Sequence, residues 1–251
     1  MSGDFHRNRF GHARTIQIPH GRTAQVVGNE RRAAGMIAVI GMITTTGALQ
    51  VPAPLVRVTE GSRIVASVRN DLTEPLRVHG FCARDGSACP ALDVPPATAC
   101  KIHFVAARAG TYHYWATSTG APLPFRGGPD AQLSGAFIVD PVGATIANDR
   151  VMVLTEWTSL TRPQLKDLTS ATDIGAAFRA LDPQFTLLVN GLSWPATERL
   201  TYNLGERIHW RVVNLSSQFH PMHLHGSTSK PSRSAMASAT RPSPPNSGSA
   251  W

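Results

Sequence analysis

Three histidines lie close together near the C-terminal end of the chain, in the segment His220-Pro221-Met222-His223-Leu224-His225-Gly226. Pro221 disfavours a helix here because proline lacks an amide hydrogen and fixes φ. In an extended chain His223 and His225 point to the same side, and Pro221 redirects the chain so that His220 can face elsewhere. Imidazoles this close suit a transition metal such as copper or zinc, at one site or at two adjacent ones. The alternative is a polar cluster in a loop.

The elements that must position these histidines are β-strands. Residues 63–70 place Ile64, Ala66 and Val68 on one face, the alternation of a half-buried strand. One stretch, 165–181, is predicted to be helical, and Gly175 weakens it. Further strands are predicted at residues 101–105, 135–139 and 151–154.

An internal repeat indicates a duplicated domain. Residues 61–70 (GSRIVASVRN) match residues 205–214 (GERIHWRVVN) at a constant offset of 144 residues. The apolar face is kept in the second copy by Ile208, Trp210 and Val212, and the same offset carries His79 onto His223. A repeat this long predicts two copies of one all-β domain rather than a solenoid.

The second copy is shorter than the first. After His225 only 26 residues remain, and 227–250 consist mainly of small and polar residues with proline and arginine. Such a composition cannot supply strands with a buried face. We therefore expect the second domain to lack part of its sheet and to leave apolar surface and strand edges open.

The histidine segment resembles the HPxHLHG motif of multicopper oxidases. Four other segments agree with this resemblance, which spans about residues 50–226. They are residues 54–61 (PLVRVTEG, similar to "PGPxIRVxEG"), 109–115 (AGTYHYW, similar to "PGTYxYH"), 133–139 (LSGAFIV, similar to "xxGAxIV") and 189–191 (VNG, similar to "INGxxxP"). The resemblance implies an all-β fold of two consecutive cupredoxin-like Greek-key β-sandwiches, the second incomplete.

The resemblance also implies copper as the cofactor. In the family, a type-1 copper takes electrons from a small reducing substrate and passes them to a three-copper cluster, where dioxygen is reduced to water. Carried over by motif, His220 is the type-1 candidate, His223 the type-2 candidate and His225 a type-3 candidate. His79 aligns with the second histidine of the family's HWHG and is another type-3 candidate.

The sequence departs from the family pattern at several ligand positions. The first histidine of HWHG falls on Arg77, and the family's HSH falls on Trp115-Ala116-Thr117. The family's last motif, HCHxxxH, has no counterpart, so the chain offers no thiolate for a type-1 centre. We therefore expect a copper-binding protein with a partial site and assign no catalytic residue.

Two other interpretations stay open. One is a copper-poor cupredoxin scaffold without oxidase activity. The other, a two-domain enzyme of the nitrite-reductase type, needs type-1 histidine and cysteine ligands in the first domain, and residues 115–117 argue against it. A zinc site of three histidines and water is chemically possible.

The tail after Gly226 suggests a hypothesis about the gene. The family usually continues with an aromatic strand such as Phe-Tyr-Phe, whereas this chain reads Ser227-Thr228-Ser229. The codons GGC TTC TAC TTC with one T deleted encode Gly-Ser-Thr-Ser. Residues 227–251 are thus expected to be either a disordered or an out-of-frame tail, and the chain to be a fragment.

The net charge of +8 is concentrated at the two ends of the chain. Residues 1–35 and 226–251 contain most of the excess arginine and lysine, and no basic stripe runs through the body. We therefore expect no nucleic-acid or membrane partner, and homo-oligomerisation is left open. Residues 33–43 (AAGMIAVIGMI) fit either a signal-peptide core or a first strand.

The expected division of the chain is a basic, leader-like segment at 1–35, cupredoxin-like domains at 36–145 and 146–226, and the tail. Three cysteines permit at most one internal disulfide. Cys82 and Cys89 flank a turn-like segment and are the favoured pair, which would suit a periplasmic or secreted protein. The alternative is three buried or free thiols, Cys100 included.

Overall fold

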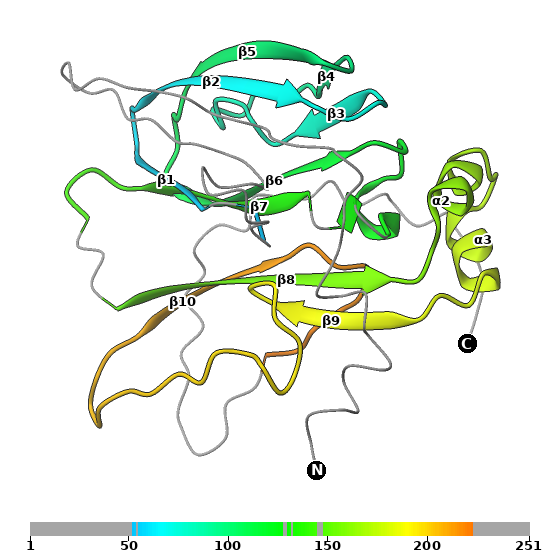
Figure 1. Cartoon of the computed structure of the whole chain (residues 1–251). Coiled ribbons are helices and arrows are strands. Elements are labelled where there is room, and N and C mark those ends of the chain that lie inside the picture. The colour runs from blue at the N-terminus through cyan, green and yellow to red at the C-terminus, as the bar shows by residue number, and fades with distance from the viewer. Residues whose placement is uncertain (1–51, 54, 128–129, 132, 145–147, 223–251) are drawn as a thin grey trace, which may run out of the picture.

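The computed structural model describes residues 52–53, 55–127, 130–131, 133–144 and 148–222. These residues form mainly β-strands, which confirms the predicted all-β class (Figure 1). The elements in chain order are β1 (Val56–Thr59), β2 (Arg63–Asn70), β3 (Leu76–His79), β4 (Leu92–Val94), β5 (Thr98–Val105), β6 (Gly110–Thr117), η1 (Leu123–Phe125), β7 (Ser134–Asp140), β8 (Asp149–Thr158), α2 (Arg162–Thr169), α3 (Ile174–Ala180), β9 (Phe185–Val189) and β10 (His209–Asn214).

The first half, β1 to β7, forms two sheets around one apolar core. One sheet has the order β1-β7-β6-β3-β4, and the other pairs β2 with β5. β2 has the predicted bounds, and its alternating residues Ile64, Ala66 and Val68 are buried. Phe137 on β7 is fully buried, and the rings of Phe104 and Tyr112 lie around it. This core fixes the position of β6, which carries several of the candidate ligand positions.

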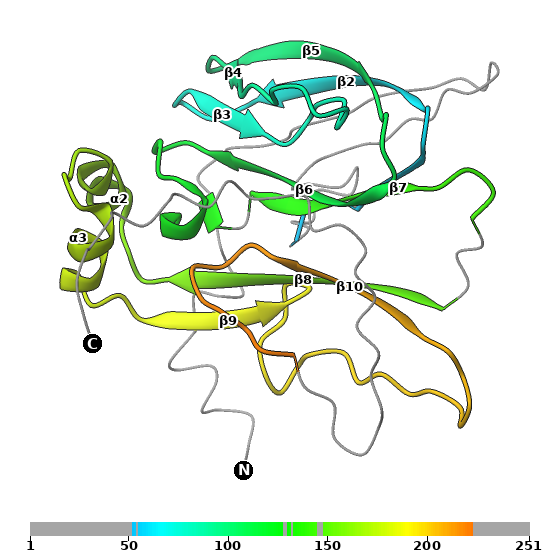
Figure 2. The same ribbon diagram turned by 180° about the vertical axis from the view of Figure 1, so that it is seen from behind.

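The second half, β8 to β10, forms a three-stranded sheet of order β10-β8-β9. It lies below the β6–β7 layer, on the side opposite to β2 and β5 (Figures 1 and 2). Ala136 and Ile138 of β7 pack against Val153 and Val213 in a shared cluster. The two halves are therefore joined through the outer face of the first sandwich.

The other face of this three-stranded sheet carries exposed apolar side chains. Leu187 and Phe185 of β9 are 45% and 42% exposed. The register pairs Leu187 with Glu156 of β8 and Phe185 with Thr158, and both of these β8 residues are buried. That the second sandwich lacks part of its sheet stays a prediction.

A network of four charged side chains also links the halves. Arg57 donates to Asp140 through Nε (2.6 Å) and Nη2 (2.8 Å), and its Nη2 also contacts Asp149. Arg211 of β10 donates through Nε to Asp149 (2.8 Å) and through Nη1 to Thr111 of β6 (2.8 Å). These contacts fix the second sheet against β1, β6 and β7.

The structure reproduces the predicted repeat in the turn that precedes β2 and β10. Gly61 and Gly205 have φ values of 83° and 84°, which favour glycine. The Ser62 amide donates to the Thr59 carbonyl at 3.0 Å, and at an offset of 144 residues the Glu206 amide donates to the Asn203 carbonyl, also at 3.0 Å. The two copies therefore enter their strands through the same turn.

The repeat continues in the turn after each strand. The Asn70 side chain accepts from the Leu72 amide and donates to the Glu74 carbonyl. Asn214 accepts from the Ser216 amide and donates to the Gln218 carbonyl, again at an offset of 144. An asparagine side chain thus closes both turns in the manner of an Asx-turn.

The apolar face expected for the second copy is placed differently. Trp210 and Val212 are only half-buried, whereas Val213, on the opposite face of β10, is buried against the first half. β10 lies on the outside of β7 with this face inward, so the burial pattern follows the contact between the halves rather than the repeat.

The predicted helical stretch 165–181 is two helices, α2 and α3. Gly175 lies inside α3, so it does not cause the break. Asp173 caps α3 because its side chain accepts the Ala176 amide at 2.9 Å. No helix of the described residues is long and apolar enough to cross a membrane.

Candidate metal site

Two adjacent strands bring together the four positions at which the resemblance expects first-domain copper ligands. β3 and β6 are antiparallel, and the register pairs Arg77 with Thr117 and His79 with Trp115. The side chains of two such cross-strand pairs are neighbours on one face. The expected ligand positions therefore do meet in this fold, but only one of the four is a histidine.

His79 lies flat against Trp115. The ring centroids are 4.0 Å apart, and the planes differ by 7°. Burial lowers the pKa of His79, and the positive charges of Arg77 and Arg126 lower it further. The imidazole is therefore neutral near pH 7, which is the form that binds a metal.

Two arginines, Arg77 and Arg126, lie near the stacked rings of His79 and Trp115. Arg77 forms a bidentate ion pair with Asp93 of β4, with Nε–Oδ1 at 2.7 Å and Nη2–Oδ2 at 2.9 Å. Arg126 is 2% exposed, and its guanidinium carbon lies 5.0 Å from the centre of the Trp115 ring. Burial lowers the pKa of Arg126 to about 10, so the side chain stays charged near pH 7.

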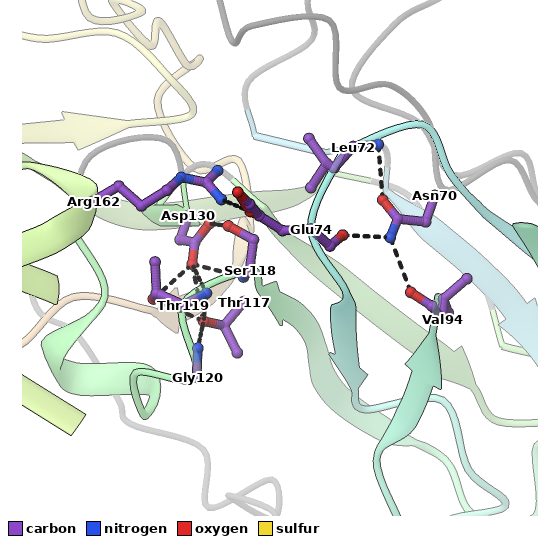
Figure 3. A network of polar contacts seen from close by, with 10 residues as sticks. All are labelled: Asn70, Leu72, Glu74, Val94, Thr117, Ser118, Thr119, Gly120, Asp130 and Arg162. Carbon is purple, nitrogen blue, oxygen red and sulfur yellow. Dashed lines mark hydrogen bonds and ion pairs between the residues drawn. The ribbon is translucent and has the colours of Figure 1, made fainter. Parts of the chain in front are cut away.

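Thr117 belongs to a hydrogen-bond network around Asp130 (Figure 3). The Asp130 carboxylate accepts the Thr117 hydroxyl (2.9 Å), and the Ser118 amide and hydroxyl (2.8 and 2.7 Å). It also accepts the Thr119 amide (3.1 Å) and hydroxyl (3.0 Å). The carboxylate thus organises the turn that follows β6 and holds Thr117 in place.

On the second half, the described structure reaches the first histidine of the motif. His220 follows the Asn214 turn, and its Nε2 lies 2.7 Å from the Ser216 hydroxyl, which itself donates to Asn214 at 2.8 Å. The repeated asparagine turn therefore orients His220. The other candidate ligands, His223 and His225, lie outside the described residues.

Within the described ranges, no three or more histidine, cysteine or acidic side chains form a group that could hold a metal ion. His113 of β6 is half-buried, and burial, together with the positive charges of Arg84 and Arg126, lowers its pKa to about 4. His103 is exposed on β5. Neither joins a ligand cluster among the described residues.

The loop that leaves β3 is tightly fixed directly after His79. Gly80 has a φ of 94°, and a Cβ at this position would lie 2.3 Å from the His113 carbonyl oxygen. The Arg84 Nη2 donates to the carbonyls of Gly80 (2.7 Å) and His113 (3.1 Å). Cys82 and Cys89 form the predicted disulfide, and Cys100 is free.

Arg126 and Asp130 were not singled out by the sequence. Both lie between β6 and β7, in a glycine-rich segment without periodicity or a recognisable motif. With these residues in place, the first-half positions do not fit the family's three-copper cluster, because they offer one imidazole beside an indole, a hydroxyl and two guanidinium groups.

Solved structures of copper proteins resemble this chain. The multicopper oxidase mgLAC aligns at 20% identity and a TM-score of 0.54, covering 82% of this chain and 63% of its own. A blue copper oxidase from Nitrosomonas europaea aligns at 18% identity and a TM-score of 0.48, covering 78% of this chain and 58% of its own. A copper nitrite reductase from the same organism has 21% identity, a TM-score of 0.48, and coverages of 76% and 66%.

The chain thus spans less than two thirds of the length of each of these structures, and the likeness to mgLAC shows a shared fold. No curated protein matches the chain. Two family models match, at residues 40–142 and 157–247, and both are described as multicopper oxidase. Between them they cover more than half of the sequence. The chain therefore belongs to the multicopper oxidase family, whose cofactor is copper.

Proposed function

We propose that this chain is a copper-binding protein of the multicopper-oxidase type with a partial copper site. His220, His223 and His225 are its main ligands, and His79 is the first-half residue that could join them. The observation that carries the proposal is the register of β3 and β6, which brings the four expected positions together with one imidazole among them. The chain then lacks a complete three-copper cluster, and reduction of dioxygen by a small reducing substrate belongs to complete relatives.

The cysteines support a partial site. A type-1 centre needs a cysteine thiolate beside histidine ligands. Cys82 and Cys89 are joined in the disulfide, and Cys100 lies on β5 with its sulfur 3.8 Å from the Asp93 carbonyl. Because Cys100 also lacks the flanking histidines of the family's HCH motif, the bound copper would lack the intense blue thiolate absorption.

Metal analysis of the purified full chain tests this proposal. We expect copper to remain bound after dialysis, without the blue band and without oxidase activity. The variant His223→Ala should lose most of this copper, whereas His103→Ala, which removes an exposed imidazole from β5, should retain it. A copper-free wild type, or equal copper in both variants, would contradict the proposal.

The contribution of His79 needs a variant that keeps its packing. In His79→Phe a ring remains to stack on Trp115, but the two nitrogens are lost. If His79 is a ligand, copper affinity measured by competition with a chelator should fall about tenfold or more, as is usual when a contact that supports a metal is removed. Unchanged affinity would restrict the site to the second half.

The second candidate function is a copper-poor scaffold. It is favoured by the protein contacts of Arg77, Trp115 and Thr117, which fill the first-half positions without a metal. A folded wild type that binds no copper even at excess would select it. The copper nitrite reductase likeness does not favour a third candidate, since residues 115–117 are Trp, Ala and Thr.

We further infer that the protein works in the periplasm or outside the cell, because disulfides persist in oxidising compartments. Thiol labelling of protein from its native source should modify one cysteine before reduction and three after it.

The hypothesis of an out-of-frame tail concerns residues outside the described ranges, most of which the second family match includes. Sequencing the gene tests it, since a gene without a downstream HCH motif in any frame rejects it.

A further inference from the structure

Each of the four expected ligand positions on β3 and β6 has a partner within the protein. On the outer side, Arg77 and Asp93 form a bidentate ion pair that joins β3 to β4. Paired fork-to-carboxylate contacts add geometric specificity as well as energy. The position where the family has its first histidine thus serves here as a link between two strands.

The central contact joins three segments. His79 of β3 stacks on Trp115 of β6, and Arg126 approaches the same indole. The Nη1 of Arg126 donates to the carbonyls of Asp130 (2.6 Å) and Ala116 (3.1 Å), which ties β6 to the segment before β7. Its Nε and Nη2 have no hydrogen-bond partner among the described residues. Part of the cost of burying this charge is therefore offset by the face of the indole.

Arg126 also acts against a metal at this place. The guanidinium is buried and stays charged near pH 7, and like charges interact strongly where water is excluded. The positive charge of Arg126 would repel a copper ion beside Trp115, but it attracts the face of the indole ring. Arg126 therefore favours an aromatic ring at position 115 and disfavours a copper ligand there.

Thr117 also has a protein partner in place of a metal, namely the Asp130 carboxylate. Thr117 is 2% exposed and donates to Asp130. A histidine at this position would need more room and would remove one of the contacts that hold the carboxylate. The three replaced ligands thus fit three separate protein partners, namely Asp93, Arg126 and Asp130.

We infer that the former ligand face of β3 and β6 is a copper-independent clamp, in which contacts between side chains hold together the strands that a metal cluster holds in complete relatives. This clamp consists of Arg77, His79, Trp115 and Thr117 with Asp93, Arg126 and Asp130. It keeps the first half folded without copper, and Arg126 disfavours a cation bound at position 115. The inference concerns the first half, so it does not require the second half to bind copper.

Hydrogen exchange of the full chain, followed by mass spectrometry, tests the clamp locally. Peptides covering 76–79 and 110–117 are compared after stripping with a chelator and after loading with excess copper. We expect both peptides to be protected in the stripped protein to the level of the β7 peptide 134–140, with no change on loading. Loss of protection on stripping, or a stripped level like that of a frayed segment, would overturn the inference.

A pair of variants separates the clamp from simple packing. Trp115→His restores the family's residue type and should lose protection of 110–117 both with and without copper, because Arg126 loses the indole and repels the metal. Trp115→Phe keeps an aromatic face and should retain more protection. Recovery of Trp115→His by copper would overturn the role given to Arg126. Should Trp115→His not fold, the wild-type comparison still decides.

Copper content measured on the same samples keeps this result apart from the proposed function. If the wild type binds no copper, the proposed function fails, but protected β3 and β6 peptides still support the clamp. If the wild type binds copper and those peptides lose protection on stripping, the clamp fails while the proposed function stands.

Discussion

The two halves of the molecule use the same turn, strand and turn but place them in different surroundings. β2 pairs antiparallel with β5 along its whole length, whereas β10 pairs parallel with β8 in the part of the chain that the structure describes. Asn70 is buried and makes a third hydrogen bond, to the Val94 carbonyl, whereas Asn214 is exposed. The local unit therefore depends on a few residues, while its contribution to stability depends on what is packed around it.

We expect the largest difference in unfolding free energy between a variant in the buried core of the first half and one at an exposed position of β9. Phe137→Ala removes a fully buried ring from the first core and should lower the free energy of unfolding by about 4 kcal/mol. Leu187→Ala, on the exposed face of β9, should change it by less than ~0.5 kcal/mol. Denaturant unfolding of the two variants measures both values. A large loss for Leu187→Ala would mean that another segment or molecule covers this face in solution.

The link between the halves is tested at Asp149, whose side chain is 4% exposed. Asp149→Asn leaves Arg57 and Arg211 without one of their charge partners and should cost about 3 kcal/mol in unfolding free energy. Arg69→Gln, which breaks an ion pair through a largely exposed arginine, should cost less than ~1 kcal/mol. Equal costs would show that the network contributes little to joining the halves.

The repeated asparagine offers a matched pair. Asn70→Ala should destabilise the protein by about 2 kcal/mol because it leaves buried backbone groups unpaired. Asn214→Ala should cost about 1 kcal/mol, since water can replace its hydrogen bonds. Because Asn214 also contacts the hydroxyl that holds His220, Asn214→Ala should weaken copper binding and Asn70→Ala should not. The reverse order of the two costs would contradict the contrast in burial.

The smallest effect expected is a pH dependence of the Asp149 variant. Burial alone would raise the pKa of Asp149, but hydrogen bonds from Arg211 and Arg57 outweigh it and leave the pKa below its ordinary value. A carboxylate with a lowered pKa contributes stability above its unfolded pKa of about 4, and this is lost as the pH falls further. The stability difference between wild type and Asp149→Asn should stay constant from neutral pH down to about 4 and narrow below it. Narrowing already near neutral pH would show that the lowered pKa of Asp149 is not its cause.

Much of the fold could be predicted from local patterns. The alternation in β2 predicted its bounds, and the repeat at offset 144 includes the glycine and asparagine of two turns that the structure repeats bond for bond. Which face of β10 is buried could not be predicted, because that depends on how the second sheet packs on β7. The same holds for the network around Asp149, whose members come from distant parts of the chain.

The parts of the candidate site that belong to a family motif could be predicted from the sequence. The single residues outside any motif that complete the site could not. The resemblance identified Arg77, Trp115 and Thr117 as departures from the family, and the register of β3 and β6 shows them side by side. It could not show that they are partnered. Arg126 and Asp130 have no sequence signal, since a lone arginine and a lone aspartate in a glycine-rich segment are common features of exposed loops.

The disulfide that closes the loop after His79 has a practical consequence for mapping this region. Because Cys82 and Cys89 enclose Arg84, a protease cut after that arginine would leave the two fragments covalently joined. A chain cut only after Arg84 would run as one band on a non-reducing gel and as two on a reducing one. Arg84 is cut only when it releases the carbonyls of Gly80 and His113. The fraction of chains cut at Arg84 therefore measures how often the loop beside β3 opens.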